Sequence, residues 1–267
     1  MNRTDRPDAR TASGGQNEAI MPTDVRCLVE VDESSAVVRI TGVLEPSDTA
    51  AVRDALLARI WARPGPVVVD LTGLRVSEPA VRAVFADVQR EVADWPAAAL
   101  LVCDPVVGAA PRSDPALAGV AVLPSLDAAL AALAESPMAA VLTADLPPVL
   151  GAAREAREMV ADGCRRWGVP ALAEAGGIAI TEMVNNVVAH AGTPMTVRLA
   201  PVGETLHLAV RDHSARQPAF AGPAPVNSPG GRGLLLIDMV ARRWGSSPVP
   251  DGKVVWCVLD PEDQPKP

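Results

Sequence analysis

The segment that most constrains this chain spans residues 180–192 and reads ITEMVNNVVAHAG. On an α-helix, residues four apart lie on one face, so Glu182, Asn186 and His190 are predicted to stack in line. The apolar residues between them recur at the three- and four-residue spacing of a stripe that faces a core. A carboxylate, an amide and an imidazole beside such a stripe predict a helix with one buried face and one polar site.

The composition sets the broad class of the protein. Of the 267 residues, 49% are hydrophobic and 21% are charged, which is enough for two modest globular domains. A formal net charge of −8 argues against a nucleic-acid footprint, which needs a basic face. No apolar run is long enough to cross a bilayer, and the first 20 residues lack the hydrophobic core of a signal peptide, so we expect a cytoplasmic protein. The four cysteines form no CxxC pair, which favours buried free thiols.

Strand and helix patterns alternate through the first half of the chain. Short apolar runs that predict strands fall at residues 27–31, 36–41, 67–71, 98–102 and 120–123. Helical stripes separate them, at residues 50–63, from residue 77 onward, and at 125–133. This alternation predicts an α/β layer structure with a partly parallel sheet.

The second half follows a different order. A strand is predicted at residues 140–143, and the later elements are a helix at 147–167, the polar helix at about 171–191, an antiparallel strand pair at 195–199 and 205–211, a loop at 213–230, a helix at 234–243 and a strand at 253–259. Asp212 falls where the strand pair ends, and the sequence Gly-Arg-Gly at 231–233 leads into the last helix.

Two stretches of the first half resemble the STAS domain, the fold of bacterial anti-anti-sigma factors. Residues 42–45 (GVLE) are similar to the "GELD" turn of that family, and residues 69–74 (VDLTGL) to its "DLSGV" strand exit. Regulated members then carry an Asp-Ser-Ser-Gly turn whose first Ser is phosphorylated, where this chain has residues 77–80 (SEPA). Glu78 therefore stands at the acceptor position, either as a fixed mimic of the phosphorylated form or in a domain that keeps its fold without regulation. Ser77 is a shifted acceptor or, as we favour, a helix N-cap.

The second half resembles the ATP-binding fold shared by gyrase, heat-shock protein 90, histidine kinases and anti-sigma factor serine kinases (the GHKL or Bergerat fold, HATPase_c). Residues 182–191 are similar to the N-box of the anti-sigma kinase branch, residues 210–214 to its short G1 box and residues 231–236 to its G2 box. Residues 243–245 and 252–256 are similar to its closing helix and strand. Each motif is weak alone, but their order and spacing together make the resemblance specific.

The two resemblances divide the chain and set its expected fold class. We expect a disordered leader at residues 1–22, a STAS-like α/β domain at 23–137, a GHKL α/β sandwich at 138–262 and a short tail at 263–267.

The GHKL resemblance also implies roles for the polar side chains. Asn186 would bind Mg²⁺ through its side-chain oxygen, and Glu182 would be the general base that orients or deprotonates the attacking hydroxyl. Asp212 would accept a hydrogen bond from the exocyclic amine of adenine, where guanine would present a second acceptor. Asn185 contributes to the site or only caps and solvates the helix. His190 touches a phosphate or, as we slightly favour, stabilises the helix end as a cation.

The glycine-rich segment would hold the triphosphate. Gly231 and Gly233 would let the backbone approach the phosphates, and Arg232 would reach them with its side chain. The helix that begins at Leu234 would offer free N–H groups and the positive end of its dipole. Residues 213–230 would form a lid over the nucleotide.

These roles imply an ATP-binding regulator of the anti-sigma factor type with protein serine kinase activity, acting by partner switching in the control of transcription. The expected partners are a sigma factor and/or a STAS-domain anti-anti-sigma protein, with no direct nucleic-acid or membrane contact. A homodimer is also allowed, because family members often pair through their sheets. Because Glu78 occupies the acceptor position, the attached STAS-like domain is expected to dock as an inhibitor or scaffold. The alternative is a non-catalytic ATP-binding module that sequesters a protein partner.

Overall fold

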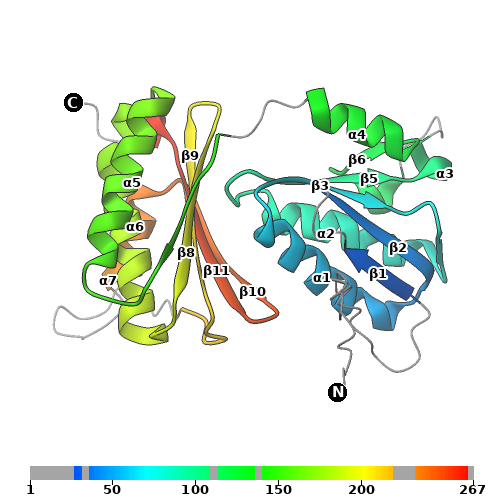
Figure 1. The fold of residues 1–267 in the computed structure, drawn as a ribbon, viewed down its shortest axis with the longest axis horizontal. Coiled ribbons are helices and arrows are strands. Elements are labelled where there is room, and N and C mark those ends of the chain that lie inside the picture. The colour runs from blue at the N-terminus through cyan, green and yellow to red at the C-terminus, as the bar shows by residue number, and fades with distance from the viewer. Residues whose placement is uncertain (1–26, 32–35, 109–113, 136–139, 219–231, 264–267) are drawn as a thin grey trace, which may run out of the picture.

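The structure is a computed structural model that describes residues 27–31, 36–108, 114–135, 140–218 and 232–263. Two α/β units lie side by side, each built on a sheet of its own (Figure 1). We call residues 27–135 the N-terminal unit and residues 140–263 the C-terminal unit. The predicted leader, the boundary near Pro137 and most of the predicted lid lie outside the described residues.

The N-terminal unit contains a mixed six-stranded sheet. Its strands run in the order β1-β2-β3-β5-β6, and β4 pairs with β2. The β1–β2 pair is antiparallel and the remaining pairs are parallel, which confirms the predicted partly parallel α/β sheet. The strands are β1 (Cys27–Val31), β2 (Val37–Leu44), β3 (Gly65–Asp70), β4 (Leu74–Val76), β5 (Ala98–Cys103) and β6 (Ala121–Leu123).

Helices cover both faces of this sheet. They are α1 (Thr49–Ala62), α2 (Ala83–Val92), α3 (Pro105–Gly108) and α4 (Leu126–Glu135). Leu56 of α1 and Phe85 of α2 are fully buried in the main core, while Ala129 of α4 packs in a smaller core on Val68 and Cys103. The main core therefore lies between the sheet and the α1–α2 layer.

The predicted acceptor turn lies on the surface of the N-terminal unit. Glu78 and Ser77 are both exposed. The N-cap of the short 3₁₀ turn Pro79–Arg82 is Glu78, so the prediction that Ser77 is the cap is wrong. Ser77 instead donates its backbone N–H to the carbonyl oxygen of Leu44 at 3.0 Å, where β2 ends.

The C-terminal unit contains a fully antiparallel sheet in the order β10-β11-β9-β8-β7. Its strands are β7 (Leu142–Leu146), β8 (Met195–Val202), β9 (Thr205–Asp212), β10 (Arg243–Val249) and β11 (Gly252–Leu259). Its helices, α5 (Ala152–Trp167), α6 (Ala173–Asn186) and α7 (Arg232–Val240), all lie on one face of the sheet (Figure 1). This arrangement gives the predicted α/β sandwich.

Three elements of the C-terminal unit differ from the sequence predictions. The helix predicted at 234–243 ends at Val240, and β10 follows it as a strand that was not predicted. Ser246, Ser247 and Pro248 are typical of a turn, but β10 lies at the edge of the sheet, where proline is tolerated. The α5 helix begins at Ala152, five residues later than predicted.

The face of this sheet that carries no helix packs against the N-terminal unit (Figure 1). Ala209, Val249 and Val254 belong to the same apolar core as α1 and α2. The guanidinium of Arg198 lies 4.3 Å from the ring centre of Trp61 and donates to the Trp61 carbonyl oxygen at 2.7 Å. The two units therefore share one hydrophobic core across their contact.

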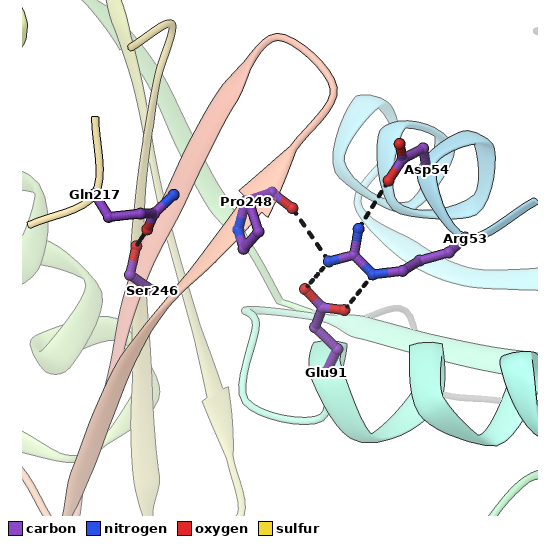
Figure 2. Close-up of polar contacts among 6 residues, drawn as sticks. All are labelled: Arg53, Asp54, Glu91, Gln217, Ser246 and Pro248. Atoms are coloured by element: carbon purple, nitrogen blue, oxygen red, sulfur yellow. Dashed lines mark hydrogen bonds and ion pairs between the residues drawn. The ribbon is translucent and has the colours of Figure 1, made fainter. Parts of the chain in front are cut away.

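Polar contacts surround this shared core. Arg243 donates to both carboxylate oxygens of Asp94, at 2.8 and 2.6 Å, and His207 Nδ1 lies 3.1 Å from the Asp94 carbonyl oxygen. Arg53, held by two hydrogen bonds to Glu91, also donates to the carbonyl oxygen of Pro248 at 3.3 Å (Figure 2). The edge strand β10 is thus anchored to the N-terminal unit.

Candidate functional site

The predicted polar helix exists, but its pitch changes within the motif. The α6 helix ends at Asn186 and continues as a π-helical segment, Val187–Ala191. Gly192, with φ at 64°, closes it by donating its N–H to the Val187 carbonyl oxygen at 2.8 Å. Single π-helical turns inside α-helices are rare and frequently occur at functional sites.

Glu182 lies against the beginning of α7. A Cβ on Gly233 would lie 2.7 Å from Glu182 Oε2, so the α7 backbone and the carboxylate are in close contact and a larger residue at position 233 would displace the carboxylate. Glu182 is half-buried, and this burial raises the pKa of its carboxyl group above the usual range. A carboxylate with a raised pKa is better suited to accept a proton near neutral pH than an ordinary surface glutamate.

Asn186 lies one turn after Glu182 and is half-buried, whereas Asn185 and His190 are exposed. Within the described parts of the chain, the Asn186 amide has no hydrogen-bond partner, so its oxygen is available to a ligand. An amide oxygen beside a nucleotide is a suitable ligand for Mg²⁺, which takes oxygen donors and keeps several waters. No group of three or more His, Cys, Asp or Glu side chains that could hold a metal ion occurs among the described residues.

Asp212 is the last residue of β9 and is 1% exposed. Its Oδ1 accepts hydrogen bonds from the Ser214 backbone N–H at 2.8 Å and from Lys253 Nζ at 2.9 Å. Its Oδ2 lies 2.7 Å from the same ammonium group. Lys253 was not predicted as a site residue. A single lysine in an otherwise apolar strand was a signal, since lysine is almost never buried unless it is paired.

Asp212 and Lys253 lie on the side of the sheet that faces the helices. Residues two apart on a strand point to the same face, and Val210 and Val255 both belong to the core beneath α5, α6 and α7. The pair therefore lies on the same side of the sheet as Glu182 and Asn186.

The glycine-rich segment is only partly described. Gly231 lies outside the described residues, and Arg232 is the first residue of α7, a helix of nine residues. Leu234 is buried in the core beneath the helices, so its contribution to a site would come from its backbone N–H. The beginning of α7 adjoins α6 where Gly233 meets Glu182.

Comparison with known proteins identifies the domain that this arrangement belongs to. Residues 146–259 match the family described as "Histidine kinase-like ATPase domain". The C-terminal half of the chain is a histidine kinase-like ATPase domain. An uncharacterized protein of Streptomyces coelicolor is 41% identical over 91 residues, which cover 32% of this chain and 84% of that protein. The chain therefore belongs to the same family as that protein.

The histidine kinase-like ATPase domain contains every predicted site residue from Glu182 to Leu234. Such a domain binds ATP, usually with Mg²⁺, and the free Asn186 amide and the buried Asp212 carboxylate fit this ligand. No helix among the described residues is long and apolar enough to cross a membrane. The STAS resemblance of residues 23–137, and the phosphorylation state of its acceptor turn, stay predictions.

Proposed function

We propose that this chain is an ATP-binding regulator of the anti-sigma factor type that phosphorylates a serine on a partner protein. The observation that carries this proposal is the half-buried Glu182 carboxylate, which lies against the beginning of α7 and one turn before Asn186. A domain that only binds ATP needs groups that contact the adenine, the phosphates and Mg²⁺. It has no need of a desolvated carboxylate at the phosphate end.

Each residue of the site has a part in the proposed transfer. Asp212 holds the adenine, and the free N–H groups at the beginning of α7 hold phosphate oxygens. Mg²⁺, bound through the Asn186 oxygen, would neutralise charge on the phosphates. Glu182 accepts the proton of the serine hydroxyl while the serine oxygen attacks the terminal phosphorus of ATP. The bond to the bridging oxygen breaks, and ADP leaves with the electron pair.

The proposed substrate is a serine of a separate STAS-domain protein, and a sigma factor is the second proposed partner. The chain's own acceptor turn has Glu78, which offers no hydroxyl group. Ser77 belongs to the N-terminal unit, which packs on the face of the sheet opposite α6 and α7 (Figure 1). Phosphorylation within one molecule would therefore require the two units to separate.

The N-terminal unit has a proposed role as a docked scaffold. Its α1–α2 layer contributes to a core that includes Val254 of β11, and Arg53 holds the edge strand β10 (Figure 2). On the other side of β10, the Ser246 hydroxyl donates to the side-chain oxygen of Gln217 at 2.7 Å, within the first, described part of the predicted lid. A homodimer through this face of the sheet would require the N-terminal unit to leave it.

A phosphoryl-transfer assay tests the proposed kinase activity. The full chain is incubated with [γ-³²P]ATP and candidate STAS proteins, and ATP binding is measured in parallel by calorimetry. We expect Glu182→Gln to lower the transfer rate by about 10²-fold or more, the usual contribution of a general base, while ATP affinity changes little. Glu174→Gln, an exposed glutamate in the first turn of the same helix, is the matched control.

Two results would contradict the kinase assignment. One is an equal transfer rate in the wild type and in Glu182→Gln. The other is tight ATP binding without transfer to any STAS protein tested, which would favour the non-catalytic binding module.

A further inference from the structure

The ion pair between Lys253 and Asp212 is built by the local backbone. Lys253 lies directly opposite Asp212 in the β11–β9 register. Gly252, the preceding residue, has φ at 151°, and a Cβ there would lie 1.9 Å from the Asp212 carbonyl oxygen. Only glycine allows this approach, so the chain brings the lysine onto the carboxylate by a backbone conformation that other residues rarely adopt.

The contribution of this pair to folding does not account for its presence. Lys253 is 7% exposed and Asp212 is 1% exposed, so both charges are removed from water. Replacing a buried ion pair by apolar residues of similar volume is often neutral or stabilising, because desolvation offsets the attraction. The Lys253–Asp212 ion pair therefore adds little to the stability of the fold. Because it lies where adenine is expected to bind, ligand recognition explains its presence better.

The hydrogen bonds of the pair leave one acceptor and one donor side by side. Asp212 Oδ1 already accepts two hydrogen bonds, whereas among the described residues Oδ2 accepts only from the ammonium and keeps a lone pair for a ligand. Lys253 has three N–H donors, and the longest of its hydrogen bonds to described residues is the 3.3 Å contact with the Ser214 carbonyl oxygen. The N–H group in this long contact is the one that can most easily exchange its present partner for a ligand atom.

We propose that Lys253 and Asp212 together recognise adenine, with Lys253 donating to ring nitrogen N1 while Asp212 Oδ2 accepts from the exocyclic amine. This inference rests on the proposed nucleotide site. Adenine presents a donor and an acceptor at these adjacent positions, which complements the acceptor and donor of the pair. Guanine presents them in the opposite order, so its carbonyl would meet the carboxylate and its N1–H would meet the ammonium. Both contacts would be lost, and buried polar groups would be left unpaired.

Nucleotide analogues separate the two contacts. The full chain is titrated by calorimetry with the Mg²⁺ complexes of ATP, GTP, 1-deaza-ATP, which lacks the N1 acceptor, and purine riboside triphosphate, which lacks the amine. We expect the wild type to bind 1-deaza-ATP about tenfold more weakly than ATP, and GTP more weakly still.

Variants of Lys253 then assign the N1 contact. Lys253→Met keeps the length of the side chain without a donor, and we expect it to bind ATP and 1-deaza-ATP equally. It should still prefer ATP over purine riboside triphosphate, because Asp212 is unchanged. Lys253→Arg keeps a donor and should retain a preference for ATP over 1-deaza-ATP. Circular dichroism of each variant shows that it is folded.

Three outcomes would overturn this inference. The first is equally tight binding of 1-deaza-ATP and ATP by the wild type, a measurement that needs no variant. The second is a preference of Lys253→Met for ATP over 1-deaza-ATP that is as strong as that of the wild type. The third is tighter binding of ATP by Lys253→Met than by the wild type, which would mean that the lysine competes with adenine for Asp212. Absence of ATP binding by the wild type would instead refute the nucleotide site itself.

Discussion

Acidification is expected to destabilise the contact between the two units through one histidine. His207 lies on β9 on the side facing the N-terminal unit and is 4% exposed. Its Nδ1 lies 3.1 Å from the Asp94 carbonyl oxygen, which only accepts, so Nδ1 carries the proton of the neutral ring. Burial lowers the pKa of His207, and the positive charge of Arg243 acts in the same direction, while the hydrogen bond to Asp94 and its carboxylate oppose the change.

The sign and size of the effect follow from proton uptake. The unfolded chain binds a proton at this histidine near pH 6.5, whereas the folded chain binds it only at lower pH. As pH falls below 6.5, the unfolded state gains a proton that the folded state lacks, so the free energy of unfolding decreases. The decrease has a maximum slope of about 1.4 kcal/mol per pH unit, and reaches at most about 1.4 kcal/mol at pH 5.5.

Urea unfolding at pH 7.5, 6.5 and 5.5, followed by tryptophan fluorescence, measures this decrease. We expect the wild type to lose more stability than His207→Gln between pH 7.5 and 5.5, since glutamine does not titrate. Identical pH slopes in the wild type and His207→Gln would refute the reasoning, as would a wild type that loses less stability than His207→Gln.

Further predictions concern glycines at close contacts and the proposed base. Gly252→Ala would place a Cβ 1.9 Å from the Asp212 carbonyl oxygen, so we expect a loss of about 3 kcal/mol or more in urea unfolding and weaker ATP binding by calorimetry. In α6, Gly176→Ala would place a Cβ 2.8 Å from a valine of α5 and should lower the melting temperature, whereas Gly177→Ala meets open space and should raise stability by up to about 1 kcal/mol. Equal melting temperatures for these two variants would contradict the α5–α6 packing. Because the pKa of Glu182 is raised, the transfer rate should fall with acidification at a midpoint above the ordinary 4.5 of a glutamate, and Glu182→Gln should lack this dependence. A midpoint at or below 4.5 would count against Glu182 as the base.

Local patterns predicted the elements that carry the site. The spacing of Glu182 and Asn186 placed both on one helix, and the position of Asp212 after an alternating run placed it at a strand end; the structure has both. The strand β10 was missed because Pro248 and its neighbouring serines are typical of turns. Their compatibility with a strand depends on its place at the sheet edge, which no local pattern specifies.

Contacts between distant segments could not be predicted in the same way. Lys253 and Asp212 meet because the β11–β9 register sets them opposite each other, and a shift of one residue would turn the lysine to the other face. Arg198 and Trp61 are 137 residues apart in the chain, and their contact depends on how the two units pack. Periodicity indicates which residues of a strand are buried, but not which segment covers them.

Titration of the full chain with ATP and Mg²⁺ by calorimetry, comparing the wild type with Asp212→Asn, tests the central claim most directly. The account predicts saturable binding of one ATP per chain by the wild type. It also predicts at least about tenfold weaker binding by Asp212→Asn, because an amide replaces the buried carboxylate that accepts from adenine. Equal affinities, or no binding by the wild type, would contradict it.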